Sequence, residues 1–147
     1  MGAVLMHIKG SQIHDGEVQT VEFTTQGMLE CDQSGYTLSY QDSEIDSEDD
    51  TLTEIRVDKH TVSMRKTGNI ETFFLFEQEK TYQTTYQTPL GVIEIALYPT
   101  LVNKRKGETG GTIELEYVLN IAGSQIVNHL SLDYVNRKSW MKEETKK

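Results

Sequence analysis

The residues of this chain that could do chemistry include one dense acidic run. The stretch "DSEIDSEDD", residues 42–50, places six carboxylates in nine positions, and such oxygen ligands could attract a hard cation such as Ca²⁺. The calcium loop of EF-hands has glycine at its sixth position and glutamate at its twelfth. A loop that starts at Asp42 has Ser47 and Thr53 there. We therefore interpret the run as a solvated acidic loop between strands.

Histidine and cysteine spacing gives no support for a metal site. The four histidines are His7, His14, His60 and His129. None forms the paired spacing of a zinc site, and a lone cysteine cannot complete the usual ligand sets. We therefore predict no metal and no cofactor. The hairpin pairing derived below turns Cys31 inward between apolar neighbours, so we expect a buried, inert thiol.

The paired carboxylates Glu114 and Glu116 are the remaining acid-base candidates. They alternate with Ile113 and Leu115, so they belong to the opposite face of the same strand. Catalytic carboxylates need a sheltered pocket that shifts their pKa values. We expect these two to point outward, and with no catalytic residues assigned an enzymatic activity ranks last among the functions considered.

Several tyrosines share their predicted inward faces with aliphatic residues. Burying a large side chain stabilises by about 1.5–3 kcal/mol, and an unpaired hydroxyl costs about 1–3 kcal/mol. Inward tyrosines therefore indicate an interior with hydrogen bonds, trapped water or a small ligand. The candidate ligand-binding residues are Tyr36, Tyr40, Tyr82, Tyr86, Tyr117 and Asn128. A core filled by side chains, with satisfied hydroxyls at its rims, explains the same residues equally well.

The elements that must position these side chains are strands. Apolar residues recur mostly at every second position, which is the period of a half-buried strand. Turn signals such as "QSG" (33–35), "DKH" (58–60), "TGN" (67–69) and "GETGG" (107–111) separate runs of about ten residues, as in an antiparallel all-β domain. We predict no helix longer than a short turn.

Hairpin pairing tests this interpretation, because apolar residues should face apolar ones across an even-numbered loop. Loops at 33–34, 59–60 and 89–90 and a Gly123-Ser124 turn give inward pairs throughout. The predicted pairs include Cys31 with Tyr36, Leu29 with Leu38, Val57 with Val62, Ile55 with Met64, Tyr86 with Ile93, Tyr82 with Leu97, Tyr117 with Leu130 and Asn128 with Leu119. Tyr82 and Tyr86 should therefore point into the domain.

About eight to ten strands, each apolar on one side, must bury that side. A sandwich would do so, but short turns without a long crossover favour a single closed antiparallel up-and-down β-barrel. Closure also removes exposed sheet edges. We predict this barrel over residues 1–136, followed by a charged tail over 137–147.

Composition limits the partners. The 23 acidic and 14 basic residues give a net charge of −9, which opposes binding to nucleic acid. No apolar run approaches the roughly 20 residues of a membrane span. A single cysteine and the absence of a leader segment make the cytoplasm the expected location.

Several stretches together resemble a known family. They are "TVEFTTQG" (20–27), "YTLSYQDSE" (36–44), "VSMRKTG" (62–68), "TPLGVIEI" (88–95) and "GTIELEYVLNIAG" (111–123). In order and spacing they look like the YwiB-like proteins, small uncharacterised bacterial proteins. The resemblance covers about residues 4–134 and implies a calycin-like, lipocalin-type barrel. It carries over no catalytic residue and no ligand.

Two functions follow as hypotheses. The first is a non-catalytic cytoplasmic barrel that binds a small, partly apolar molecule in its interior. The alternative is an interaction module with a solid core, which uses its outer surface or the tail around Trp140 to bind a protein partner or a second copy of itself. A cavity of roughly 300 Å³ or more would favour the first, and an exposed apolar patch would favour the second.

Overall fold

The computed structural model describes residues 2–42, 51–68 and 71–136, and all regular structure in these ranges is β-strand. The strands are β1 (Gly2–His14), β2 (Glu17–Cys31), β3 (Gly35–Asp42), β4 (Thr51–Asp58), β5 (Thr61–Thr67), β6 (Thr72–Glu77), β7 (Tyr82–Thr88), β8 (Gly91–Lys106), β9 (Gly110–Ile121) and β10 (Ser124–Asn136). The predicted all-β class is confirmed. The acidic residues 43–50 and the tail 137–147 lie outside the described residues.

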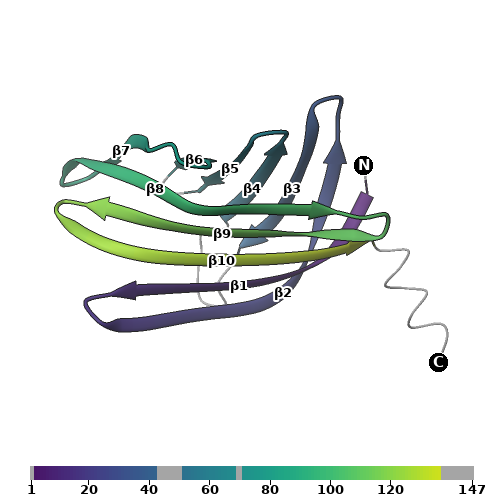
Figure 1. Cartoon of the computed structure of the whole chain (residues 1–147), viewed down its shortest axis with the longest axis horizontal. Helices are drawn as coiled ribbons and strands as arrows, with labels where there is room; N and C mark the ends of the chain where they lie inside the picture. Colours follow the sequence, from purple (N-terminus) through teal and green to yellow (C-terminus); the bar gives the residue numbers. More distant parts are fainter. Residues whose placement is uncertain (1, 43–50, 69–70, 137–147) are drawn as a thin grey trace.

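The strands form one antiparallel sheet that curls into a nearly closed up-and-down barrel. Its order is β6-β5-β4-β3-β2-β1-β10-β9-β8-β7. The first strand therefore pairs with the last, and the edges of the sheet are β6 and β7, which follow one another in the sequence. In Figure 1, β8, β9, β10 and β1 cross the front of the view, and β3 and β4 run steeply behind them.

Aromatic side chains close the seam between β6 and β7, where the described residues form no ladder. The ring centroids of Phe73 and Tyr82 lie 6.1 Å apart, and those of Phe74 and Tyr86 also lie 6.1 Å apart. Aromatic pairs at such distances contribute about 0.5–1.5 kcal/mol beyond area burial. Side-chain packing thus covers two strand edges that would otherwise be open to another chain.

Most of the predicted hairpin registers are confirmed. Cys31 pairs with Tyr36, Leu29 with Leu38, Val57 with Val62, Ile55 with Met64, Tyr86 with Ile93, and Tyr82 with Leu97. Tyr82 and Tyr86 are half-buried and pack against the core, as predicted. The inward faces of these strands were therefore assigned correctly.

The predicted register of the last hairpin is wrong by two residues. Its loop is Ala122-Gly123, so Asn128 pairs with Tyr117 and not with Leu119. Both loop residues have positive φ, 50° for Ala122 and 84° for Gly123, as in the type I′ turn whose twist matches the flanking strands. A shift of two leaves every side chain on its own face, so the predicted inward positions still hold.

The inward faces meet in one apolar core. Its fully buried side chains are Phe76, Met6, Leu38, Ile55, Leu97, Ile113, Leu115, Leu132, Val4, Val62 and Thr53. Complete burial of such aliphatic and aromatic side chains stabilises by about 1.5–3 kcal/mol each. Thr53 is the polar member of this set, and its surroundings belong to the candidate site.

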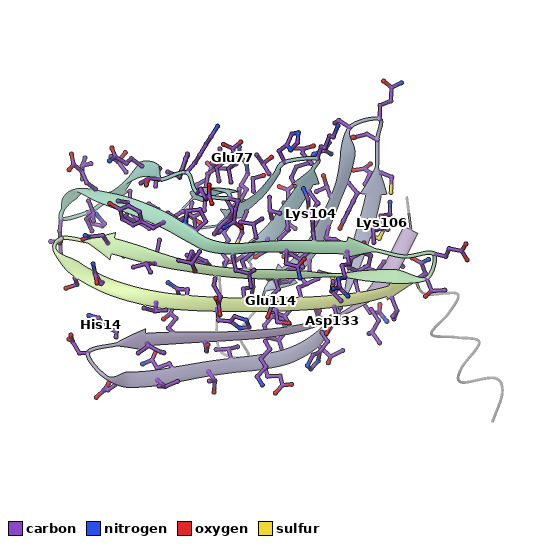
Figure 2. All side chains as sticks on the ribbon, viewed as in Figure 1. His14, Glu77, Lys104, Lys106, Glu114 and Asp133 are labelled. Atoms are coloured by element: carbon purple, nitrogen blue, oxygen red, sulfur yellow. The ribbon has the colours of Figure 1, made fainter. Side chains whose placement is uncertain are left out.

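One end of the barrel is closed by β8. A β-bulge after Pro99 shifts its register against β9, and bulges bend a strand. Beyond the bulge the Lys104 ammonium donates a hydrogen bond to the carbonyl oxygen of Asp58. The Val102 amide donates to the side-chain oxygen of Gln78, at 3.1 Å. Lys104 and Lys106 mark this closed end in Figure 2, and His14 marks the opposite end of the molecule.

An ionic cluster on the outer surface holds the turn between β2 and β3. The guanidinium of Arg56 contacts both carboxylate oxygens of Asp32, with the Nη2–Oδ1 distance at 2.8 Å, and also pairs with Asp58 at 2.9 Å. Asp32 also accepts hydrogen bonds from the amides of Ser34 and Gly35, at 3.0 and 2.9 Å. Arg56, followed by the Ser34 amide, holds the pKa of Asp32 well below its usual range.

Candidate functional site

A hollow of about 310 Å³ lies inside the barrel, toward the end away from Lys106. Its lining includes an inward residue from each of six strands: Ile8, Phe23, Tyr40, Lys66, Tyr117 and Asn128. Three of these, Tyr40, Tyr117 and Asn128, are candidate ligand-binding residues from the sequence. We refer to this space as the lumen site.

The lumen site exists because β2 parts from β3. Residues 17–29 of β2 pair with β1, but only residues 28–31 pair with β3. In the stretch without a ladder, the inward ring of Phe23 packs against the Tyr40 ring of β3, with centroids 6.1 Å apart, and both residues border the hollow. Gly27 stands where the strands part, and a Cβ atom there would collide with the Met6 sulfur and the Ser39 carbonyl oxygen. Only glycine allows this close approach.

A row of polar side chains forms one wall beside the lumen site. Tyr40 pairs with Thr53, Thr53 with Lys66, and Lys66 with Thr72. Thr53 is fully buried, and its hydroxyl has no hydrogen-bond partner among the described residues. Such a hydroxyl costs about 1–3 kcal/mol if left unpaired. Thr53 is not among the residues that border the hollow, so the part of this row that a ligand would meet consists of Tyr40 and Lys66.

Lys66 is the cation of that wall. It follows the buried residues Val62 and Met64 at the inward positions of β5, and it is itself half-buried. None of the carboxylates in the described part of the chain forms an ion pair with it. Its positive charge therefore faces the lumen site without a counter-charge from those residues.

Tyr117 and Asn128 form the opposite wall as a directly paired couple. Asn128 is 3% exposed and donates from Nδ2 to the Ile126 carbonyl oxygen at 3.2 Å. The Tyr117 ring packs edge-on against Phe76, with centroids 4.8 Å apart. Burial raises the pKa of Tyr117 to about 12, so its phenol remains a neutral hydrogen-bond donor at physiological pH.

The other predicted tyrosines lie elsewhere in the barrel. Tyr36 packs against Tyr134 with ring centroids 6.0 Å apart, near the closed end, and its ring lies 4.9 Å from the Lys106 ammonium. Tyr82 and Tyr86 lie at the seam. Burial raises the pKa of Tyr86, partly offset by a hydrogen bond with Thr72. The structure thus divides the predicted set between the lumen site, the closed end and the seam.

The expectation of a buried Cys31 is wrong. The residue is exposed, and its sulfur lies 3.4 Å from the Lys106 ammonium nitrogen. Alternation placed it on the inward face opposite Tyr36, and that pairing is correct. Cys31 is, however, the last residue of β2 and lies at the barrel rim. An inward-pointing side chain at the rim is not covered by other strands. The expected outward positions of Glu114 and Glu116 are confirmed by the burial pattern of β9.

Sequence reasoning missed Lys66 and Thr53. The signal was present for Lys66, because Val62, Met64 and Lys66 occupy alternate positions and so share a face. A lysine at the end of an apolar face is usually solvated, which is why the pattern alone did not single it out. Thr53 gave no signal of its own, since threonine is common in strands.

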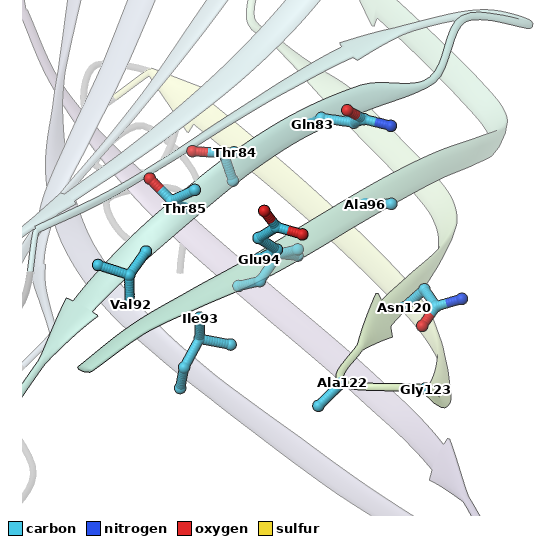
Figure 3. Close-up of a pocket in the computed structure, with 11 residues that line it drawn as sticks. Gln83, Thr84, Thr85, Val92, Ile93, Glu94, Ala96, Asn120, Ala122 and Gly123 are labelled. Carbon is cyan, nitrogen blue, oxygen red and sulfur yellow. The ribbon is translucent and has the colours of Figure 1, made fainter. Parts of the chain in front are cut away.

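A larger hollow of about 950 Å³ lies on the outside of the sheet, over β7, β8 and β9. Figure 3 shows Val92, Glu94 and Ala96 on β8 and Asn120 on β9 among its lining residues. Val92 and Glu94 are exposed, so this is an open concave surface. The lumen site encloses more of a small molecule and collects more buried polar groups, which are the marks of a ligand pocket.

Within the described residues, no group of three or more histidine, cysteine, aspartate or glutamate side chains is placed to hold a metal ion. No described helix has the length and apolar character needed to cross a membrane. The polar groups at the lumen site are amides, hydroxyls, one imidazole and one ammonium. Such groups bind and orient a molecule through hydrogen bonds and charge.

Comparison with known proteins identifies the family. Residues 6–132 match the family model described as "Domain of unknown function (DUF1934)". The chain belongs to the DUF1934 family. No curated protein matches it. The crystal structure of the ywiB protein from Bacillus subtilis superimposes with a TM-score of 0.79 at 18% sequence identity, covering 92% of each chain. That similarity confirms the barrel fold, and together with the family match it supports the resemblance to YwiB-like proteins.

Proposed function

We propose that this DUF1934 protein binds a small, partly apolar molecule in the lumen site. The observation that carries the proposal is a hollow of about 310 Å³ between the inward faces of the strands. Small-molecule sites typically measure about 300–1,000 Å³ and combine apolar walls with a few polar groups. The lumen site has both kinds of wall.

The lining divides by chemistry. Ile8, Phe23 and Leu130 supply apolar surface, while Tyr117 and Asn128 supply hydrogen-bonding groups. Lipocalin-like barrels hold their ligands in such a lumen, which supports the same use here. We place this binding protein in the cytoplasm, where a single exposed thiol such as Cys31 stays reduced.

Gly10 offers a direct way to test the proposal. It lies at an inward position beside the lumen site, and a Cβ atom there meets only ordinary contacts, the nearest at 3.8 Å. A Gly10→Phe variant should fill the space, whereas Gly10→Ala should leave most of it open. Native mass spectrometry of gently purified protein should show a co-purified mass in the wild type and in Gly10→Ala, and none in Gly10→Phe. A bound mass that survives Gly10→Phe would contradict binding in the lumen.

A second candidate function is protein association through the outer surface. Strand registers place Val18, Ile13, Val127, Val118 and Tyr98 in one outward row across β2, β1, β10, β9 and β8. Val18 is 62% exposed and Ile13 44% exposed. Contiguous exposed apolar surface of this kind is typical of interaction sites.

Light scattering after size exclusion tests the second function. A dimer or larger complex that dissociates in an Ile13→Lys variant would support it, with Lys9→Glu as a charge-changing control at an exposed position of the same strand. A monomer at all concentrations, together with a co-purified mass in the wild type in the first experiment, would favour the ligand-binding function.

A further inference from the structure

We infer that the molecule held in the lumen site is a carboxylate with an apolar body, oriented with its anionic group toward Lys66. The inference rests on the proposed function and names the chemical class of its ligand. It starts from the charges of the lining. The described residues that border the lumen site include one lysine and one histidine, and none of them is an aspartate or glutamate.

The histidine does not compete for this role. His129 belongs to the outward face of β10, and its Nε2 lies 2.8 Å from the Glu114 carboxylate. The Nε2 atom of His129 is therefore already paired with the Glu114 carboxylate. Lys66 has an inward position and forms no ion pair with the described carboxylates, so it is the group that an incoming anion would meet. In a chain with a net charge of −9, a binding space lined by a cation and no described carboxylate selects for anions by charge alone.

Neutral donors surround the same space. Gln12 and Gln19 contribute amide groups from β1 and β2, and Tyr117 contributes a phenol. Amides and hydroxyls strengthen the hold on one anionic group, since hydrogen bonds to charged groups are about twice as strong as neutral ones.

The number of cations favours a carboxylate over a phosphate. Dianionic phosphates are usually held by arginine clusters or by consecutive backbone amides in a nest or at a helix start. The described lining offers one ammonium group, and the described fold contains no helix. One positive charge matches one negative charge. The apolar body then packs against Ile8, Phe23 and Leu130.

Titration calorimetry with octanoate, octanol and octyl phosphate tests the inference, because the three probes share one chain and differ in head group. We expect octanoate to bind wild-type protein about ten- to a hundredfold more tightly than octanol, the range given by a charged hydrogen bond. Lys66→Met should remove that preference, and Lys66→Arg should keep it. Lys9→Met, at an exposed outward position of β1, should leave it unchanged.

The alternatives give distinct results. Equal binding of octanoate and octanol, unchanged by Lys66→Met but lost in Gly10→Phe, would overturn the anion assignment and leave the lumen as a binding site. Tighter binding of octyl phosphate than of octanoate would overturn the carboxylate. Failure of all three probes to bind the wild type would overturn the inference together with the proposed function. Circular dichroism of each variant shows that it has folded.

Discussion

Lys106 holds its ammonium nitrogen 3.4 Å from the sulfur of Cys31, at the rim of the closed end of the barrel. We expect the exposed thiol to react completely with Ellman's reagent in the native protein. The reagent is an anion, so Lys106→Gln should slow its reaction about fivefold, the effect of about 1 kcal/mol of attraction in water. Reaction with neutral iodoacetamide is the control, and its rate should change little. A thiol that reacts only after denaturation would contradict the exposed position of Cys31.

The Asp32 cluster makes stability depend on pH in acid. The ordinary pKa of an aspartate is 3.8, and Arg56 lowers it in the folded state. The folded state therefore releases this proton more readily than the unfolded state, and the stabilisation is complete above pH 3.8. It is lost as the pH falls from there through the folded-state pKa. Asp32→Asn should lower the urea midpoint at pH 7, and the difference from the wild type should shrink below pH 3.8. The control Glu30→Gln, which removes a carboxylate at an exposed position of β2, should leave the urea midpoint at pH 7 close to that of the wild type.

Tyr117 should affect stability at the alkaline end. Burial raises its pKa from 10.0 to about 12, so the unfolded state loses this proton first as the pH rises. As the pH rises from below 10.0 to above about 12, the stability of the wild type should fall by about 3 kcal/mol because of this residue. Tyr117→Phe should lack that part of the loss. Absorbance at 295 nm, which follows phenolate formation, should show one late-ionising tyrosine fewer in the variant.

Two glycines on neighbouring strands should respond oppositely to alanine. Gly10→Ala adds a methyl group where there is room, and should stabilise by about 0.5–1 kcal/mol because alanine costs less backbone entropy. Gly27→Ala forces a Cβ atom into Met6 and the Ser39 carbonyl, and should destabilise by about 1–3 kcal/mol. Urea denaturation of the two variants provides the comparison. A stabilising Gly27→Ala would show that β2 and β3 do not approach as closely as described.

The seam should be the first part of the barrel to open. Phe74 and Tyr86 hold it through ring packing, without a ladder between β6 and β7. Hydrogen exchange of the amides that face the seam should therefore be faster than exchange in the paired strands β1 and β10. Phe74→Ala should widen the difference, while Phe23→Ala, away from the seam, should not. Equal protection across all strands would contradict a seam closed by side chains.

The barrel could be predicted from the sequence because alternation and even-numbered loops fix the face of each residue. Tyr86 opposite Ile93 and Val57 opposite Val62 follow from those two features alone. The predicted register of the last hairpin was wrong because moving the loop from Gly123-Ser124 to Ala122-Gly123 leaves every side chain on the same face. Apolar matching cannot distinguish these two choices, whereas the backbone twist can.

The candidate site could be predicted only in part, because it depends on where strands separate. Tyr40, Tyr117 and Asn128 were found through their faces, and faces are local properties. That β2 pairs with β3 only from Met28 to Cys31 is a long-range property, and so is the position of Cys31 at the barrel rim. No spacing within a single strand contains that information.

The ladder between β1 and β10 joins the two ends of the described chain, for example Val4 with Asn136. A nascent polypeptide therefore cannot complete its barrel until the last strand has left the ribosome. Bringing β1 and β10 together costs the loop-closure entropy of almost the whole chain. Folding should therefore be slow for a domain of this size. Until then one edge of β1 is unpaired and open to pairing with another chain.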